Sequence, residues 1–135
     1  MSASVCASIR VRDFMTGADV RFTPDMEILT AINQLIKHRI TGAPVMDLHG
    51  NLVGILTEKD CMRVAVNAAY HREWGGRVEE FMTREVRTID VDASIVDVAE
   101  IFLEATFRRM PVLERHRLVG QISRHDVLQA MQNLR

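Results

Sequence analysis

This chain of 135 residues has few aromatic side chains and no marked excess of either charge. Phe, Trp and Tyr together make up 5%, too few to build stacking platforms along a single-stranded nucleic acid. Lys and Arg number 17 against 18 Asp and Glu, for a formal net charge of -1. A phosphate backbone or an anionic membrane surface requires a basic face, so this balance argues against a nucleic-acid binder and against a membrane-surface protein.

Cysteine and long apolar runs are scarce as well. Cys6 and Cys61 offer neither a disulfide framework nor the spacing of a metal site, so we expect reduced thiols. The first residues contain no apolar core long enough for a signal peptide, and no stretch approaches a transmembrane span. The expectation is a soluble cytoplasmic protein, whose 47% apolar residues suffice for one compact module.

Internal duplication is the most informative feature that is present. Phe14-Met15-Thr16 recurs as Phe81-Met82-Thr83, at an offset of 67 residues. Further matches follow in the same order, with one residue lost on the way: Asp25 with Asp92, Ile28 with Ile95, Leu35 with Phe102, Pro44-Val45 with Pro111-Val112, Leu52-Val53-Gly54 with Leu118-Val119-Gly120, and Asp60 with Asp126. The chain therefore contains two copies of one supersecondary unit, predicted over residues 8–70 and 78–133 with a linker over 71–77.

Each copy has the pattern of helix, hairpin and helix after a short extended segment. In the first copy, apolar residues at helical spacing follow Pro24, and Asp25 is expected in the first turn of that helix. The hairpin strands are expected over 43–46 and 52–56, with the second helix beginning near Thr57. In the second copy we expect strands over 110–113 and 118–122, and a helix from Ser123 towards Leu134.

The same spacing of a glycine, a hydroxyl residue and an aspartate recurs at the end of both hairpins. The residues are Gly54, Thr57 and Asp60 in the first copy, and Gly120, Ser123 and Asp126 in the second. A hydroxyl followed three residues later by an acid is a capping pattern for a helix start. The same two groups beside open N–H groups also suit a ribose and a phosphate. The residues alone leave both interpretations open.

Taken together, these motifs resemble the CBS (cystathionine-β-synthase) domain family, in the form of a stand-alone tandem pair, over about residues 8–133. The carriers are the repeated Phe-Met-Thr, the strand start Ile40-Thr41-Gly42-Ala43-Pro44-Val45, and the glycine-hydroxyl-aspartate spacing. The resemblance implies an α+β fold in which two CBS repeats form a pseudo-twofold pair. It also implies a regulatory module that binds AMP, ADP, ATP or S-adenosylmethionine in clefts between the repeats, with no obligatory cofactor.

The resemblance implies two composite sites. One would place the adenine near Val20, Ile40, Thr41 and Pro44, and the ribose on Ser123 and Asp126. The mirror site would use Phe107, Arg108 and Pro111 with Thr57 and Asp60, and Arg109 matches a phosphate-binding position of the family. Arg108 stands where many members have a small Ser or Thr, so the site at Asp126 is expected to be the better one. The alternative interpretation of the two arginines is a solvated edge.

Neither catalysis nor a metal site is expected. Ser123, His125 and Asp126 lie at one helix start, where their side chains point apart, and the five histidines show no ligand pairing. The chain leaves no room for an effector domain, so the output is expected to lie with another protein or with assembly. The alternative function is a ligand-free scaffold for dimerisation and partner docking.

A homodimer is the expected assembly. The helices from Asp60 and Asp126 carry more apolar residues than one small core needs, and the resemblance implies that they pair between subunits. These residues are Met62, Val66, Ala69, Val127, Leu128, Ala130, Met131 and Leu134.

Overall fold

The computed structural model describes residues 8–133, which form two units with separate cores. The continuous unit is Asp19–Val86. The split unit combines residues 8–18 with residues 87–133. Cys6 and Leu134 lie outside the described residues. The two units are described one at a time below.

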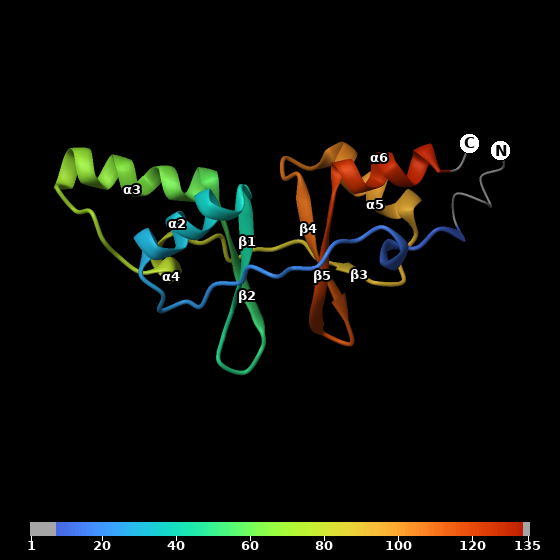
Figure 1. The fold of residues 1–135 in the computed structure, drawn as a ribbon, viewed down its shortest axis with the longest axis horizontal. Coiled ribbons are helices and arrows are strands. Elements are labelled where there is room, and N and C mark those ends of the chain that lie inside the picture. The colour runs from blue at the N-terminus through green and yellow to red at the C-terminus, as the bar shows by residue number, and fades with distance from the viewer. Residues whose placement is uncertain (1–7, 134–135) are drawn as a thin grey trace. The chain divides into compact units, whose positions relative to one another are not determined.

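The continuous unit is built on one antiparallel hairpin, β1 (Gly42–Met46) with β2 (Leu52–Thr57), flanked by α2 (Ile28–His38), α3 (Glu58–His71) and the short α4 (Val78–Phe81) (Figure 1). α2 begins three residues after the predicted Asp25. The carboxylate of Glu27 caps it by accepting from the backbone N–H groups of Leu29 and Thr30, at 3.0 and 3.2 Å. Asp25 lies outside the helix and accepts from the hydroxyl of Thr23 at 2.8 Å. The expectation for Asp25 was therefore wrong, because Glu27 supplies the N-cap.

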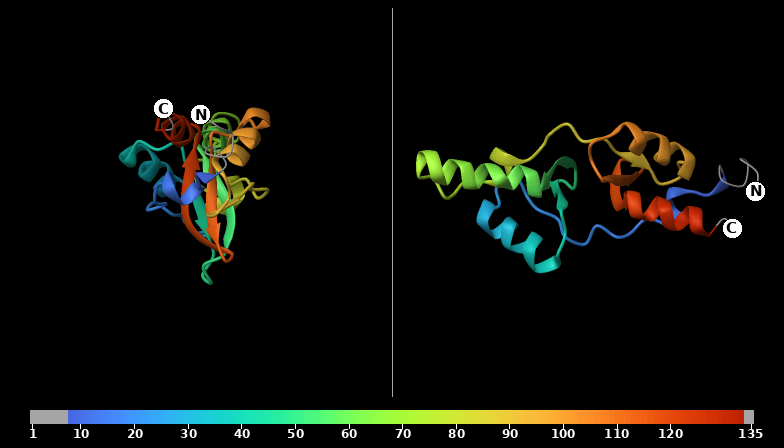
Figure 2. Two further views of the ribbon diagram at one scale, coloured as in Figure 1. Left: turned by 90° about the vertical axis from the view of Figure 1, so that its right-hand side faces the viewer. Right: turned by 90° about the horizontal axis from the view of Figure 1, so that it is seen from above.

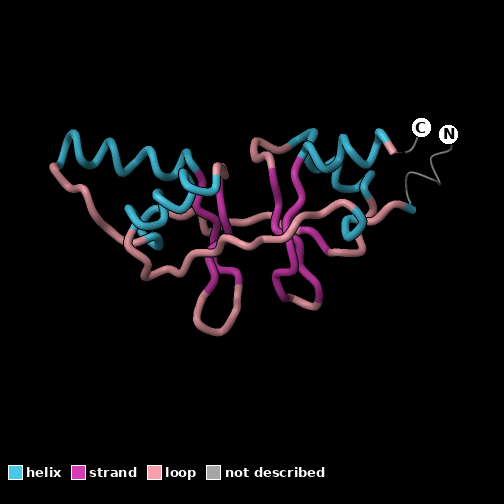
Figure 3. The backbone as a smooth tube through the Cα atoms, in the orientation of Figure 1, coloured by secondary structure: helices cyan, strands magenta, loops and turns pink. Residues whose placement is uncertain are grey.

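The split unit repeats this plan with β4 (Arg109–Glu114) and β5 (Arg117–Ser123), to which β3 (Ile89–Asp90) adds a parallel strand. Its helices are α5 (Ile95–Glu104) and α6 (Arg124–Gln132), which pack against each other, and the single 3-10 turn η1 (Val11–Asp13). In each unit the long helices lie at the end of the hairpin opposite its turn (Figures 2 and 3). The predicted hairpins and helices are present in both units.

The leading segments are exchanged between the sequence repeats. Thr16, from the first repeat, pairs its backbone with Gln121 of β5 through two hydrogen bonds of 2.9 Å. Thr83, from the second repeat, pairs in the same way with Ile55 of β2, at 2.8 and 2.9 Å. Each hairpin thus gains an edge from the other sequence repeat. The segments expected to be extended also contain the helical turns η1 and α4.

The repeated glycines make this exchange possible. A Cβ on Gly54 would lie 2.9 Å from the carbonyl oxygen of Thr83, and one on Gly120 would lie 2.5 Å from that of Thr16. Real Cβ atoms do not approach so closely, so only glycine lets the exchanged backbone cross the hairpin at this point. The Phe-Met-Thr motif and the glycine therefore recur together because they are in contact.

Candidate functional site

The hydroxyl and carboxylate of each repeat form a capping box where the hairpin returns into a helix. The Thr57 hydroxyl accepts from the Asp60 N–H at 3.2 Å, and the Asp60 carboxylate accepts from the Thr57 N–H at 3.0 Å. Ser123 and Asp126 repeat the arrangement at 3.2 and 2.8 Å. Both aspartates are buried: Asp60 is 5% exposed to solvent and Asp126 is 6% exposed. The capping interpretation is therefore confirmed, and it places a negative charge at the first turn of α3 and of α6.

The two carboxylates differ in what else they bind. The Thr83 hydroxyl donates to both oxygens of Asp60, at 3.0 and 3.2 Å. Thr16 holds the matching place in the split unit, yet within the described part of the chain its hydroxyl makes no such bond to Asp126. The Asp126 Oδ1 atom accepts no hydrogen bond from the described residues. Asp126 thus has one more free acceptor position than Asp60, whose Oδ1 atom already accepts from Thr83.

Three predicted residues of the continuous unit, Thr41, Thr57 and Asp60, meet at the start of α3. The Thr41 carbonyl accepts from the Glu58 N–H at 2.9 Å, and Gly42 pairs with Thr57 across the hairpin. Thr41 is exposed, whereas Ile40 is half-buried against the core of this unit. Two other predicted residues belong to the same unit: half-buried Val20, which packs on its core, and buried Pro44, which accepts from the Phe22 N–H at 2.9 Å.

The matching residues Arg108, Ser123 and Asp126 of the split unit meet at the start of α6. The Arg108 carbonyl accepts from the Arg124 N–H at 3.0 Å, and Arg109 pairs with Ser123 across the hairpin. The Arg109 guanidinium donates to the side chain of Gln121 at 3.5 Å. Phe107 packs edge-on against Phe102, with ring centroids 6.0 Å apart, and Pro111 is buried in β4. The composite sites combine one set from each unit, and that combination stays a prediction.

The charges at the two helix starts also differ. The first two residues of α3 are Glu58 and Lys59, whereas those of α6 are Arg124 and His125. Since an α-helix N-terminus already favours anions, the guanidinium of Arg124, with no acid among the first two residues, makes the start of α6 the more favourable place for a phosphate.

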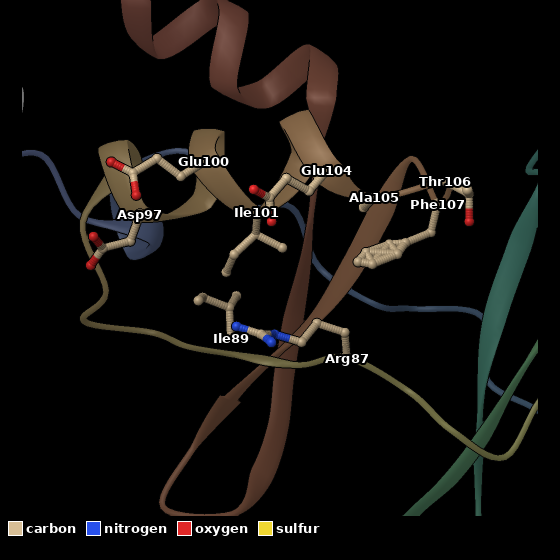
Figure 4. Close-up of a pocket in the computed structure, with 9 residues that line it drawn as sticks. All are labelled: Arg87, Ile89, Asp97, Glu100, Ile101, Glu104, Ala105, Thr106 and Phe107. Atoms are coloured by element: carbon tan, nitrogen blue, oxygen red, sulfur yellow. The ribbon is translucent and has the colours of Figure 1, made fainter.

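An open hollow of about 830 Å³ lies beside α5 in the split unit (Figure 4). Ile89, Ile101 and Phe107 supply apolar surface, Asp97, Glu100 and Glu104 line it from α5, and Arg87 lies across it beside Ile89. Phe107 is the one predicted site residue in this hollow. Sequence reasoning did not predict Arg87 as a site residue, although at the offset of 67 residues it corresponds to Val20, which was predicted.

Cys61 follows Asp60 directly and is buried. Burial, with smaller contributions from the charges of Asp60 and Glu58, raises the pKa of its thiol to about 11. The thiol therefore stays protonated near neutral pH, which makes it a poor nucleophile and metal ligand.

Among residues 8–133, no cluster of three His, Cys, Asp or Glu side chains could hold a metal ion. Within the same residues, no helix combines the length and apolarity needed to span a membrane.

Solved structures share this fold. The crystal structure of CBSX2 in complex with AMP is 27% identical, with a TM-score of 0.82, and the match covers 93% of this chain and 98% of that one. The CBS domain pair of protein MJ0100, in complex with 5′-methylthioadenosine and S-adenosyl-L-methionine, is 29% identical with a TM-score of 0.77 and the same two coverages. The predicted α+β fold of two CBS repeats is thereby confirmed.

Curated relatives place the same module in proteins of different lengths. The A-adding tRNA nucleotidyltransferase of Aquifex aeolicus is 29% identical over 123 residues, which are 91% of this chain and 14% of that protein. The chain spans less than two thirds of the length of the first curated relatives that it matches. The similarity to this enzyme thus concerns only a small part of it. The family described as CBS domain matches residues 11–67 and 78–133. The chain belongs to the CBS domain family.

Proposed function

We propose that this chain is a regulatory, non-catalytic module that senses an adenosine-containing ligand, of the class of AMP, ADP, ATP or S-adenosylmethionine. Two lines of support favour it. Structural neighbours at 27% and 29% identity are complexes with AMP and with S-adenosyl-L-methionine. The hydroxyl and carboxylate pairs of this chain stand at two helix starts, where ribose and phosphate groups are readily bound.

The unengaged oxygen of Asp126 is the observation that carries the proposal. A ribose presents two neighbouring hydroxyl donors, and a carboxylate held rigidly by a capping box can accept from them without further ordering. Arg124 at the same helix start, and Arg109 on the adjoining strand, would attract a phosphate. Following the resemblance, Val20, Ile40, Thr41 and Pro44 would contact the adenine.

The mirror site, with Phe107, Arg108, Pro111, Thr57 and Asp60, is the weaker of the two in this proposal. The Asp60 carboxylate already accepts the Thr83 hydroxyl, which both of its oxygens share, and exposed Arg108 stands at the position of Thr41. We therefore expect one ligand per chain, and AMP to bind more tightly than adenosine. Binding would regulate a partner protein only if the ligand had different affinities for two arrangements of the molecule.

Titration calorimetry with AMP and with adenosine tests this proposal. Asp126→Asn retains an oxygen that can accept from the Ser123 N–H, so the cap survives, but it replaces the unengaged acceptor with a donor and removes the charge. We expect this variant to bind AMP about 10- to 100-fold more weakly, as for the loss of a hydrogen bond to a charged group. Asp60→Asn is the matched control and should alter affinity far less.

Equal losses in the two variants would contradict the assignment of the better site to Asp126. Thermal unfolding supplies a second measurement, because a ligand at 100 times its dissociation constant stabilises the fold by about 2.7 kcal/mol. If no adenosyl compound at millimolar concentration shifts the unfolding of the wild-type chain, the scaffold function is the correct one.

The scaffold alternative draws on the exposed apolar residues of α3 and α6. Met62, Val66, Leu128 and Met131 are 61%, 51%, 61% and 54% exposed, and Ala69 is exposed too. Val127 and Ala130, expected at the same surface, are instead buried in the core of the split unit. The residues that remain exposed fit a homodimer, which we include in the proposed function together with a cytoplasmic location. Light scattering at tens of micromolar would detect the dimer.

A further inference from the structure

The turn that joins β4 to β5 has a backbone conformation that its residues do not favour. Glu114 pairs with Arg117, so the loop consists of Arg115 and His116 alone, and their φ angles are 51° and 68°. Two left-handed residues in a two-residue hairpin loop are typical of a type I′ turn, for which Asn-Gly or Gly-Gly is strongly preferred. In this conformation the Cβ atom lies close to the following carbonyl oxygen, and arginine has no short polar group to compensate. The stability of the turn therefore does not explain why these two residues are there.

The matching turn of the continuous unit has residues that suit its geometry. Asp47 accepts from the backbone N–H groups of His49 and Asn51, at 2.8 Å each, and the glycine between them takes the positive φ. Elsewhere among the described residues, a positive φ without glycine occurs only at Arg39 and Arg72, which end α2 and α3. A basic side chain there compensates the helix dipole. No helix ends at the β4–β5 turn, so this reason does not apply to it.

The β4–β5 turn also concentrates polar groups that have no partner. Arg115, His116 and Arg117 are exposed, and none of them forms an ion pair or a side-chain hydrogen bond within the described part of the chain. Glu114 pairs with Arg117 across the hairpin, but its carboxylate accepts from Arg12 instead, at 3.1 Å. Arg12 thereby offsets the charge of the acid next to the turn. Two guanidinium groups and an imidazole remain available to an anionic partner.

The position of this turn favours a macromolecule over a small ligand. It lies at the end of its hairpin opposite the helices, where Figure 1 draws it as a protruding loop. Small molecules bind in concave sites, and the hollow of Figure 4 includes none of the turn residues. Nucleic acids and anionic membranes require a broad basic face, whereas this chain has a net charge of -1. A small group of bases on a protruding tip fits an acidic segment of another protein.

We propose that the Arg115–His116 turn is a docking site for an acidic segment of a partner protein, whose Asp or Glu carboxylates accept paired hydrogen bonds from the guanidinium groups. A two-residue loop closed by a strand pair has little backbone freedom, so these groups are displayed at a low entropic cost of binding. None of the residues predicted to contact an adenosyl ligand lies in this turn. The site adds a class of partner to the proposed regulatory function, and docking does not require the ligand.

Replacing the turn by the residues that its geometry prefers tests this proposal. Arg115→Asn with His116→Gly keeps the type I′ turn, relieves its backbone and removes both side chains. We expect the melting temperature to rise by a few degrees. Binding of a fluorescein-labelled decapeptide of aspartate and glutamate, measured by fluorescence anisotropy at low salt without nucleotide, should weaken about fivefold. If this variant gains stability but binds the peptide with unchanged affinity, the docking site is overturned.

Arg72→Gly is the matched control in the continuous unit. It also relieves a left-handed residue and removes one guanidinium group, so it should leave the affinity for the acidic peptide unchanged. Equal losses in the two variants would reduce the effect to overall charge and overturn the proposal. Tighter binding of duplex DNA or of phosphatidylserine vesicles than of the acidic peptide would overturn the choice of a protein partner. Because nucleotide is absent throughout, a failure of the adenosyl proposal would leave these results unaffected.

Discussion

The two units share one plan and differ in how their polar groups are used. In the continuous unit the Thr83 hydroxyl donates to both oxygens of Asp60, whereas no group among residues 8–133 donates to Oδ1 of Asp126 in the split unit. Both carboxylates serve equally as helix caps, so capping explains why each repeat has one. It does not explain the difference between them. The two units thus share one fold, while among the described residues only the Asp126 carboxylate has an oxygen that accepts no hydrogen bond.

A second difference concerns how each exchanged segment is attached. In the split unit, Arg12 donates to Asp92 at 2.9 Å and to Glu114 at 3.1 Å. The matching residues of the continuous unit are Glu79, Asp25 and Asp47, which are all acids. Both units also attach the segment through matching backbone bonds: from Glu79 to Pro24 at 3.0 Å in the continuous unit, and from Arg12 to Val91 at 3.0 Å in the split unit. The backbone attachment is therefore common to both units, and the split unit adds the ion pairs of Arg12 to it.

Substituting the repeated glycines should produce the largest change in stability. Gly120→Ala introduces a methyl group 2.5 Å from the Thr16 carbonyl oxygen, and Gly54→Ala one 2.9 Å from that of Thr83. We expect each to lower the free energy of unfolding by about 1–3 kcal/mol, as for overpacked sites, with Gly120→Ala the more severe. Urea denaturation measures both. Gly75→Ala is the control, because its nearest neighbour would be 3.9 Å away, and it should cost far less.

The opposite order of severity would show that the exchanged segment of the split unit moves aside more readily than that of the continuous unit. If neither variant changes the stability, the exchanged segments cross the hairpins at a greater distance from the two glycines than the structure shows.

Sequence periodicity was sufficient for the elements that repeat and insufficient for the contacts between distant segments. The turn over 47–51 and both hairpins follow from local residues, because turn chemistry and alternation act over a few positions. The pairing of Thr16 with Gln121 depends on residues more than a hundred positions apart, and no local pattern encodes it. The turns η1 and α4 have three and four residues, too few for a helical period to be seen.

The misplaced interface residues could have been corrected from the duplication itself. After the loss of one residue, Val127 corresponds to Cys61 and Ala130 to Val64. All four are buried, so these positions belong to the core of each unit and not to a surface between subunits. Comparing the two copies position by position identifies core residues more reliably than counting apolar residues on one helix. Of the candidate site, both capping boxes were foreseen and the bond from Thr83 to Asp60 was not, while the composite ligand sites stay a prediction.

Cys61→Val tests whether the two cores are equivalent, and we expect it to change the stability less than the glycine substitutions do. Valine already occupies the corresponding position 127, and Cys61 is 9% exposed against 6% for Val127. Because the side chains are close in volume, we expect a change of less than about 1.5 kcal/mol in the free energy of unfolding. In the wild-type chain, iodoacetamide should label Cys61 slowly at pH 8 and faster as the pH approaches the thiol pKa of about 11. Rapid labelling at pH 7 would contradict a buried, neutral thiol.

The smallest effect is expected at Arg12, where the two units differ most in charge. Hydrogen bonding to Arg12 lowers the pKa of Asp92. The pair therefore stabilises the fold fully above the ordinary aspartate pKa of about 3.9, and this contribution is lost as the pH falls through the lowered value in the folded state. Arg12→Gln should lower the melting temperature slightly at pH 7, less in 1 M salt, and by a vanishing amount in strong acid. Glu79→Gln, at the matching position, loses only an exposed contact of 3.6 Å with Arg77, so its effect at pH 7 should be smaller. A loss at Arg12 that is independent of both pH and salt would mean that the aliphatic part of this side chain, and not its charge, attaches the exchanged segment.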